Sequence, residues 1–121
     1  MTTLSRDDRL SEIKFDILEM TTKISIKLKK ELSPKIIDEL MTIGKDHYET
    51  YQTLGWAPVG QAIVYGEERR LGFHLSSQLS GNMERHVKLM KKHKCLDEEM
   101  FAATYAYHYL SSLNERLENR Q

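Results

Sequence analysis

The sequence predicts an all-α fold: a single-domain bundle of four to five helices that spans residues 1–121 and opens with a long helical hairpin. Apolar residues recur at spacings of three and four through most of the chain, which places them along one face of a helix. Capping residues, prolines and glycines separate these stretches. The 121 residues suit one domain, and a 40% hydrophobic content with zero net charge is typical of a folded chain.

The first helix is predicted over residues 6–32. Ser5 with Asp8 three residues later has the spacing of a capping box, and an acidic first turn suits the positive end of the helix dipole. The seam is predicted to consist of apolar residues three and four apart: Leu10, Ile13, Ile17, Met20 and Ile24. Four more apolar residues widen this surface: Phe15, Leu18, Ile26 and Leu28. This pattern indicates a long bundle helix.

A second helix is predicted to follow directly and to end at Gly55. Pro34 cannot continue the first helix but suits the first turn of a new one, and Ser33 is placed to cap it. The apolar face of this helix carries Ile36, Leu40, Ile43, His47 and Leu54. Because the turn between two long helices is so short, we expect them to form an antiparallel hairpin.

Residues 55–60 are predicted to form a loop, and the stretch 59–79 allows two interpretations. Its leucines have helical spacing, at Leu71, Leu75 and Leu79. Its glycines each disfavour a helix by about 1 kcal/mol, at Gly60, Gly66 and Gly72. We prefer a helix, and a short strand over 62–65 is the alternative.

Ser80-Gly81-Asn82 is predicted to break the chain before two further helices. Asn82 is a suitable cap for a basic fourth helix over 82–96, and Asp97 for a fifth helix with acids in its first turn. The fifth helix has a seam of small and apolar residues: Ala103, Ala106, Leu110, Leu113 and Leu117.

Composition limits the compartment and the partners. Eighteen basic residues balance eighteen acidic ones, which argues against a globally charged partner such as an anionic membrane. The start of the chain lacks the apolar core of a signal peptide, and no apolar run is long enough to span a membrane. Cys95 is the single cysteine and suits a reducing compartment. We therefore expect a cytoplasmic protein with no membrane partner.

The sequence predicts no catalytic residue, no metal site and no cofactor. The sequence has no nucleophile elbow, no phosphate-binding loop and no zinc-protease motif. His86 and His93 share a helix face, but a zinc site needs further ligands and Cys95 falls on the opposite side.

Two functional hypotheses remain, and the first is a non-enzymatic protein-interaction module, such as a small regulator, adaptor or inhibitor. On the fifth helix Phe101, Tyr105 and His108 lie opposite the seam, so we expect them to be exposed in a monomer and to bind a partner. A second patch of interface-type aromatics is predicted at Tyr48, Tyr51 and Trp56. This hypothesis favours a homo-oligomer, and among homo-oligomers a dimer. The alternative is that these aromatic residues complete the core of the chain itself.

The second hypothesis is a DNA-binding regulator. The segment 82–96 follows a predicted helix and break, which is the outline of a helix-turn-helix motif. Its basic residues would contact nucleic acid: Arg85, Lys88, Lys91, Lys92 and Lys94.

Overall fold

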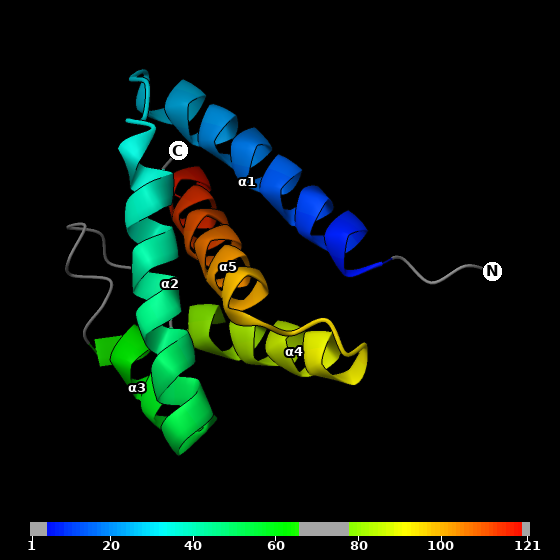
Figure 1. Cartoon of the computed structure of the whole chain (residues 1–121). Helices are drawn as coiled ribbons and strands as arrows, with labels where there is room; N and C mark the ends of the chain where they lie inside the picture. The colour runs from blue at the N-terminus through cyan, green and yellow to red at the C-terminus, as the bar shows by residue number, and fades with distance from the viewer. Residues whose placement is uncertain (1–4, 66–77, 120–121) are drawn as a thin grey trace.

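The structure, a computed structural model, describes residues 5–65 and 78–119 (Figure 1). These residues form five helices and no strand, which confirms the all-α prediction. The helices are α1 (Arg6–Leu28), α2 (Lys35–Leu54), α3 (Trp56–Tyr65), α4 (Gln78–Lys92) and α5 (Glu98–Glu118). Within these two ranges, no helix is both long enough and apolar enough to span a bilayer.

Helix α5 lies at the centre of the bundle. Figure 1 shows it (orange to red) between α1 and α2, and it packs against α1, α2 and α4. Its buried residues occupy every side of the helix: Met100, Phe101, Ala102, Ala103, Thr104, Tyr105, Ala106, Tyr109, Leu110, Ser112, Leu113 and Asn114. A helix that is apolar on both faces is thus surrounded by its own chain.

The turn between α1 and α2 lies where the sequence places it, although α1 ends four residues earlier than predicted. Lys29 adopts the left-handed conformation with φ of 55°, which closes the helix there. Beyond the turn the two helices diverge and α5 fills the space between them, so both arms pack chiefly on α5 (Figure 1). We call residues 29–34 the elbow.

Helix α2 approaches α5 closely through Gly44. A Cβ atom at Gly44 would lie 2.7 Å from the backbone Cα of Ala102. The absence of a side chain therefore lets the two helices touch, and the neighbouring Leu40 and Ile43 bury their side chains beside this crossing.

The predicted loop over 55–60 is wrong beyond its first residue. Gly55, with φ of 85°, makes the break, and α3 begins directly at Trp56. Pro58 fits in the first turn of α3 because the backbone N–H groups there have no partner within the helix. The strand alternative over 62–65 is also wrong, since these residues belong to α3. The rest of the ambiguous stretch, 66–77, lies outside the described residues.

The predicted break at Ser80-Gly81-Asn82 is wrong, because α4 runs through it without interruption. Four buried residues spaced three and four apart hold this helix on the core: Leu79, Met83, Val87 and Met90. Their burial outweighs the cost of one interior glycine, about 1 kcal/mol. The helix ends at Lys92 instead of residue 96, and Lys94 turns the chain with φ of 57°.

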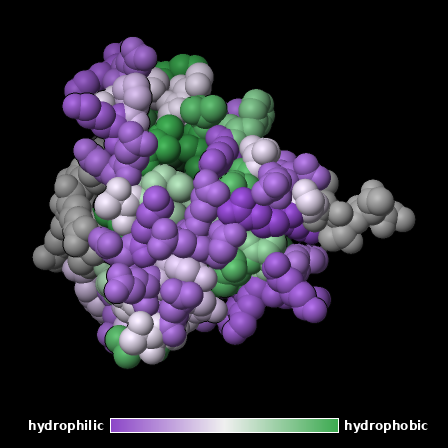
Figure 2. All heavy atoms as spheres, viewed as in Figure 1, coloured by the Kyte–Doolittle hydropathy of each residue, from purple (hydrophilic) through white to green (hydrophobic). Residues whose placement is uncertain are grey.

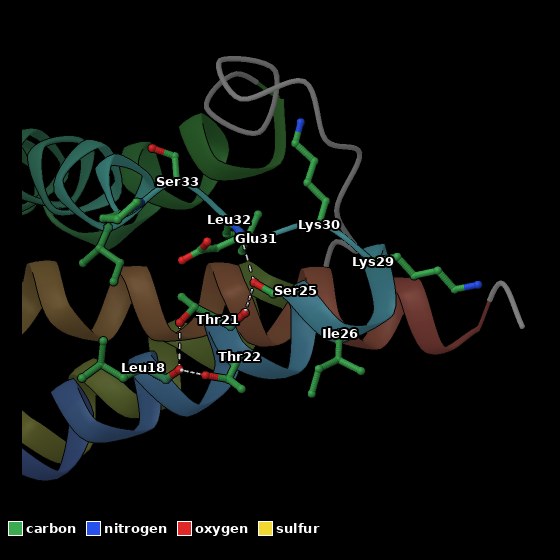
Figure 3. Close-up of a pocket in the computed structure, with 12 residues that line it drawn as sticks. Leu18, Thr21, Thr22, Ser25, Ile26, Lys29, Lys30, Glu31, Leu32 and Ser33 are labelled. Atoms are coloured by element: carbon green, nitrogen blue, oxygen red, sulfur yellow. Dashed lines mark hydrogen bonds between the residues drawn. The ribbon is translucent and has the colours of Figure 1, made fainter.

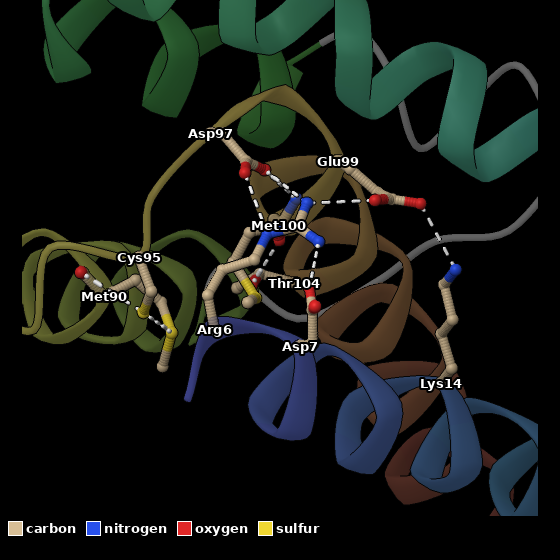
Figure 4. Close-up of polar contacts among 9 residues, drawn as sticks. All are labelled: Arg6, Asp7, Lys14, Met90, Cys95, Asp97, Glu99, Met100 and Thr104. Carbon is tan, nitrogen blue, oxygen red and sulfur yellow. Dashed lines mark hydrogen bonds and ion pairs between the residues drawn. The ribbon is translucent and has the colours of Figure 1, made fainter. Parts of the chain in front are cut away.

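Two groups of ionic contacts fix the position of α1. At its start Arg6 donates to Asp97 at 2.9 Å and to Glu99 at 2.9 Å (Figure 4). Asp97 also caps α5 by accepting a hydrogen bond from the Met100 N–H, as predicted. Near the end of α1, the ammonium group of Lys27 lies 2.6 Å from the Glu118 carboxylate. These contacts join both ends of α1 to α5, and the buried seam of Leu10, Ile13, Ile17 and Ile24 determines which face of α1 points outward.

Candidate functional site

The predicted aromatic face of α5 is part of the core. Phe101 and Tyr105 have no exposed surface, so the expectation that they are exposed in a monomer is wrong. The reason is that α2 covers this face: the rings of Tyr48 and Tyr51 lie 5.2 and 5.4 Å from that of Phe101. His47, also on α2, packs edge-on against Tyr105.

His108 pairs with a histidine of α4. Its Nε2 atom lies 2.9 Å from Nδ1 of His86, within hydrogen-bond distance. Burial, then the nearby His86 and Arg85, lower the pKa of His108 to about 4. Burial also lowers the pKa of His86. Both rings are therefore neutral at pH 7 and can share one hydrogen bond, which links α4 to α5. In the described part of the chain, no three ligating side chains gather around a possible metal position.

The second predicted patch is half-buried, and part of it meets the predicted basic residues. Tyr48, Tyr51 and Trp56 all pack partly against the core. Tyr48 and Tyr51 also line a small hollow of about 290 Å³ together with Lys91, Lys94 and Leu96. Tyrosines predicted to bind a protein thus lie beside lysines predicted to bind nucleic acid. No local pattern in the sequence indicates that the two groups meet.

The basic residues of α4 and of the turn after it are exposed, but they do not form the predicted motif. Arg85 donates a hydrogen bond to Asn82, and Lys88 lies 3.5 Å from Glu84 on the same helix. Because α4 continues through residues 80–82, the turn that the helix-turn-helix outline requires is missing.

Helix α1 carries an exposed apolar surface, although its apolar residues were predicted to widen the buried seam. Phe15, Leu18 and Ile26 have exposed fractions of 62%, 57% and 71%. At about 100° per residue they lie, with Thr22, on one side of α1, roughly 150° from the buried seam. We call these four residues the α1 stripe. The signal was present in the sequence: these apolar residues fall opposite the seam and do not widen it.

The α1 stripe continues into a groove at the elbow. This elbow groove has a volume of about 570 Å³, and Leu18 and Ile26 line it together with elbow residues and Ile37 of α2 (Figure 3). Its other apolar walls are Leu32, Pro34 and Ile37. Figure 2 shows hydrophobic residues gathered in the upper part of this view, with hydrophilic residues around them.

The hydroxyl groups in the elbow groove are used by its own backbone. Thr21 and Thr22 donate to the Leu18 carbonyl at 2.8 and 3.1 Å. Ser25 donates to the Thr21 carbonyl and accepts from the Leu32 N–H at 3.1 Å (Figure 3). Since these hydroxyl groups are satisfied internally, the groove offers an incoming group chiefly apolar contact, beside the charged Lys29, Lys30 and Glu31 that also line it.

No known protein family, curated protein or solved structure matches this chain.

Proposed function

We propose that the protein is a non-enzymatic interaction module that binds a protein partner through the α1 stripe and the elbow groove. One observation carries the proposal: three large apolar side chains are exposed on one face of α1 and lead into an apolar groove. Single exposed apolar residues are normal in soluble proteins, whereas contiguous patches mark interaction surfaces.

The surroundings of the stripe have the composition of a protein interface. An apolar centre with a charged rim is typical of such sites. Glu12 and Glu19 border the stripe towards the start of α1, and Lys23 and Lys29 towards its end, all four exposed. The buried seam of α1, together with the contacts of Arg6 and Lys27 with α5, holds this surface in place before any partner arrives. A rigid surface loses less conformational entropy on binding.

Photo-crosslinking tests this proposal. A photoreactive phenylalanine analogue replaces Ile26 in the chain expressed in its own cells, and the same analogue replaces Leu89 as a control. Leu89 is an exposed leucine on α4, away from the stripe. We expect a discrete covalent adduct with a protein from position 26, lost when Leu18→Asp is added, and none from position 89. Equal adducts at both positions, or none at position 26, would contradict the proposal.

The DNA-binding hypothesis keeps exposed lysines in its favour but loses its helix-turn-helix outline. If α4 bound DNA, reversing Arg85, Lys88 and Lys92 to Glu would weaken binding and lower the salt dependence by about one unit per lost phosphate contact. Tight, salt-sensitive DNA binding by the unchanged chain would favour this hypothesis over the one proposed.

A further inference from the structure

The charges beside the α1 stripe are distributed unevenly along the helix. At about 100° per residue, Glu12 and Glu19 lie on one flank of the stripe in its N-terminal half. Lys23 lies on the same flank farther along, and Lys29 follows at the C-terminal end. On the other flank Lys14 is already paired with Glu99 at 3.2 Å. One half of the stripe is thus bordered by acids and the other by bases.

This arrangement is self-complementary only for antiparallel helices. A two-fold axis perpendicular to α1 near residues 20–21 brings Glu12 of one copy level with Lys29, the residue that caps α1, of the other. The same axis brings Glu19 within about one residue of Lys23, a distance of roughly 1.5 Å along the helix. A parallel two-fold pair would instead set the flank that carries Glu12 and Glu19 against the opposite flank of the other copy, so these acids would not meet Lys23. Two-fold contacts of this kind are the commonest in homo-oligomers.

The same axis matches the apolar groups. It places Phe15 of one copy opposite Ile26 of the other, and Ile26 lines the elbow groove. An exposed phenyl ring therefore faces an apolar hollow of about 570 Å³, and the two-fold symmetry repeats this match at the other end. Aromatic side chains seated in pockets are frequent anchors of protein interfaces. Thr22, a small residue beside the axis, allows the helices to approach.

We propose that the partner is a second copy of this chain, docked antiparallel along α1, with Phe15 of each copy seated in the elbow groove of the other. This inference rests on the proposed function, because it names the partner of the same surface.

Molar mass by light scattering tests whether the unchanged full chain pairs with itself. The monomer has a mass of 14.2 kDa, so a dimer has twice that value. We expect the dimer mass at a concentration of roughly 100 μM, and a shift towards the monomer mass as the chain is diluted. A monomer mass throughout this range would overturn the proposal.

A charge exchange tests the orientation. The variants E12K/E19K and K23E/K29E each place like charges across an antiparallel pair, so we expect the dissociation constant of each to rise about tenfold or more. An equimolar mixture places one wholly basic rim against one wholly acidic rim, so the mixture should dimerise again. If the mixture dimerises no more tightly than either variant alone, the acidic and basic halves do not face each other and the proposal is wrong. All four residues are exposed, and circular dichroism verifies that the variants fold.

The two proposals fail in distinguishable ways. If the unchanged chain remains a monomer while the analogue at position 26 crosslinks to one other protein, the α1 stripe is an interaction surface, but its partner is not a second copy of this chain. If the chain dimerises but Phe15→Ser has no effect on the dissociation constant, the pairing does not use the α1 stripe and the inference is overturned.

Discussion

Two glycines in helices have opposite surroundings. At Gly44 the nearest atoms to an added Cβ are backbone atoms of Ala102, the closest at 2.7 Å. At Gly81 an added Cβ would meet only the flexible end of Arg85, at 3.8 Å. The same substitution therefore tests a helix crossing at one position and helix propensity alone at the other.

Replacing Gly44 by Ala is expected to lower the free energy of unfolding by about 1–3 kcal/mol, because the backbone of α5 must move away. Replacing Gly81 by Ala should raise it by roughly 0.5–1 kcal/mol, since an interior glycine disfavours a helix. Urea denaturation of both variants measures the difference. A Gly44→Ala variant that is as stable as the unchanged chain would show that the crossing is not tight.

The His86–His108 pair predicts a loss of stability in mild acid. The pKa of His108 is about 4 in the fold and about 6.5 in the unfolded chain. Between these values the unfolded chain binds a proton that the folded chain does not. The free energy of unfolding therefore falls as the pH drops from 6.5 to 4, by at most about 3 kcal/mol.

Urea denaturation at several pH values measures this effect. His108→Gln removes the titrating group, so its free energy of unfolding should depend less on pH in this range. The lowered pKa values of Asp97 and Glu99 act in a more acidic range, because carboxylates paired with Arg6 lose their charge only below their ordinary pKa. The same pH dependence in the variant and the unchanged chain would contradict the assignment.

At the scale of elements, the sequence predicts the helices with strong local signals and misplaces the boundaries that tertiary packing decides. Ser5 and Asp97 cap α1 and α5 as expected, because capping is a contact within a few residues. Helix α4 passes through Gly81 because Leu79 gains more from the core than the glycine costs. That balance depends on neighbours that are distant in sequence.

The two faces of α5 show why periodicity alone could not locate the proposed interaction surface. Spacing indicates which side of a helix is apolar, but not which element covers it. Helix α2 covers Phe101, so a face that was predicted to bind a partner belongs to the core. Among the described residues no helix covers Phe15 of α1, and the angle between Phe15 and the buried seam was the available signal.

The burial of α5 reverses the expected outcome of its mutations. Phe101→Ala should lower the free energy of unfolding by about 3–5 kcal/mol, and Leu110→Ala by about 2–5 kcal/mol. Leu89→Ala, at an exposed position, should change it by less than about 0.5 kcal/mol. Thermal unfolding followed by circular dichroism compares the three. A Phe101→Ala variant with normal stability would indicate that the ring lies at the surface, and would support the predicted partner-binding face of α5.

At the scale of the molecule, the buried helix α5 packs against one face of each of three other helices. Helices α1, α2 and α4 each turn one face towards α5, and α3 packs on α2 and α4, so α1 is the one of the three whose packing is chiefly with α5 alone. The overall helical bundle could be predicted from apolar spacing. The elbow groove, the histidine pair and the hollow beside Tyr48 could not, because each joins residues that only the folded chain brings together.

The most direct test of the account is side-chain footprinting of the chain in its own cells, compared with dilute purified chain. A photoactivated carbene labels exposed side chains and is read by mass spectrometry. If a protein covers the α1 stripe, labelling of Phe15, Leu18 and Ile26 should be lower in cells, while Leu54 and Leu89 keep their labelling. Equal ratios for all five residues in both samples would show that the stripe is not an interaction surface.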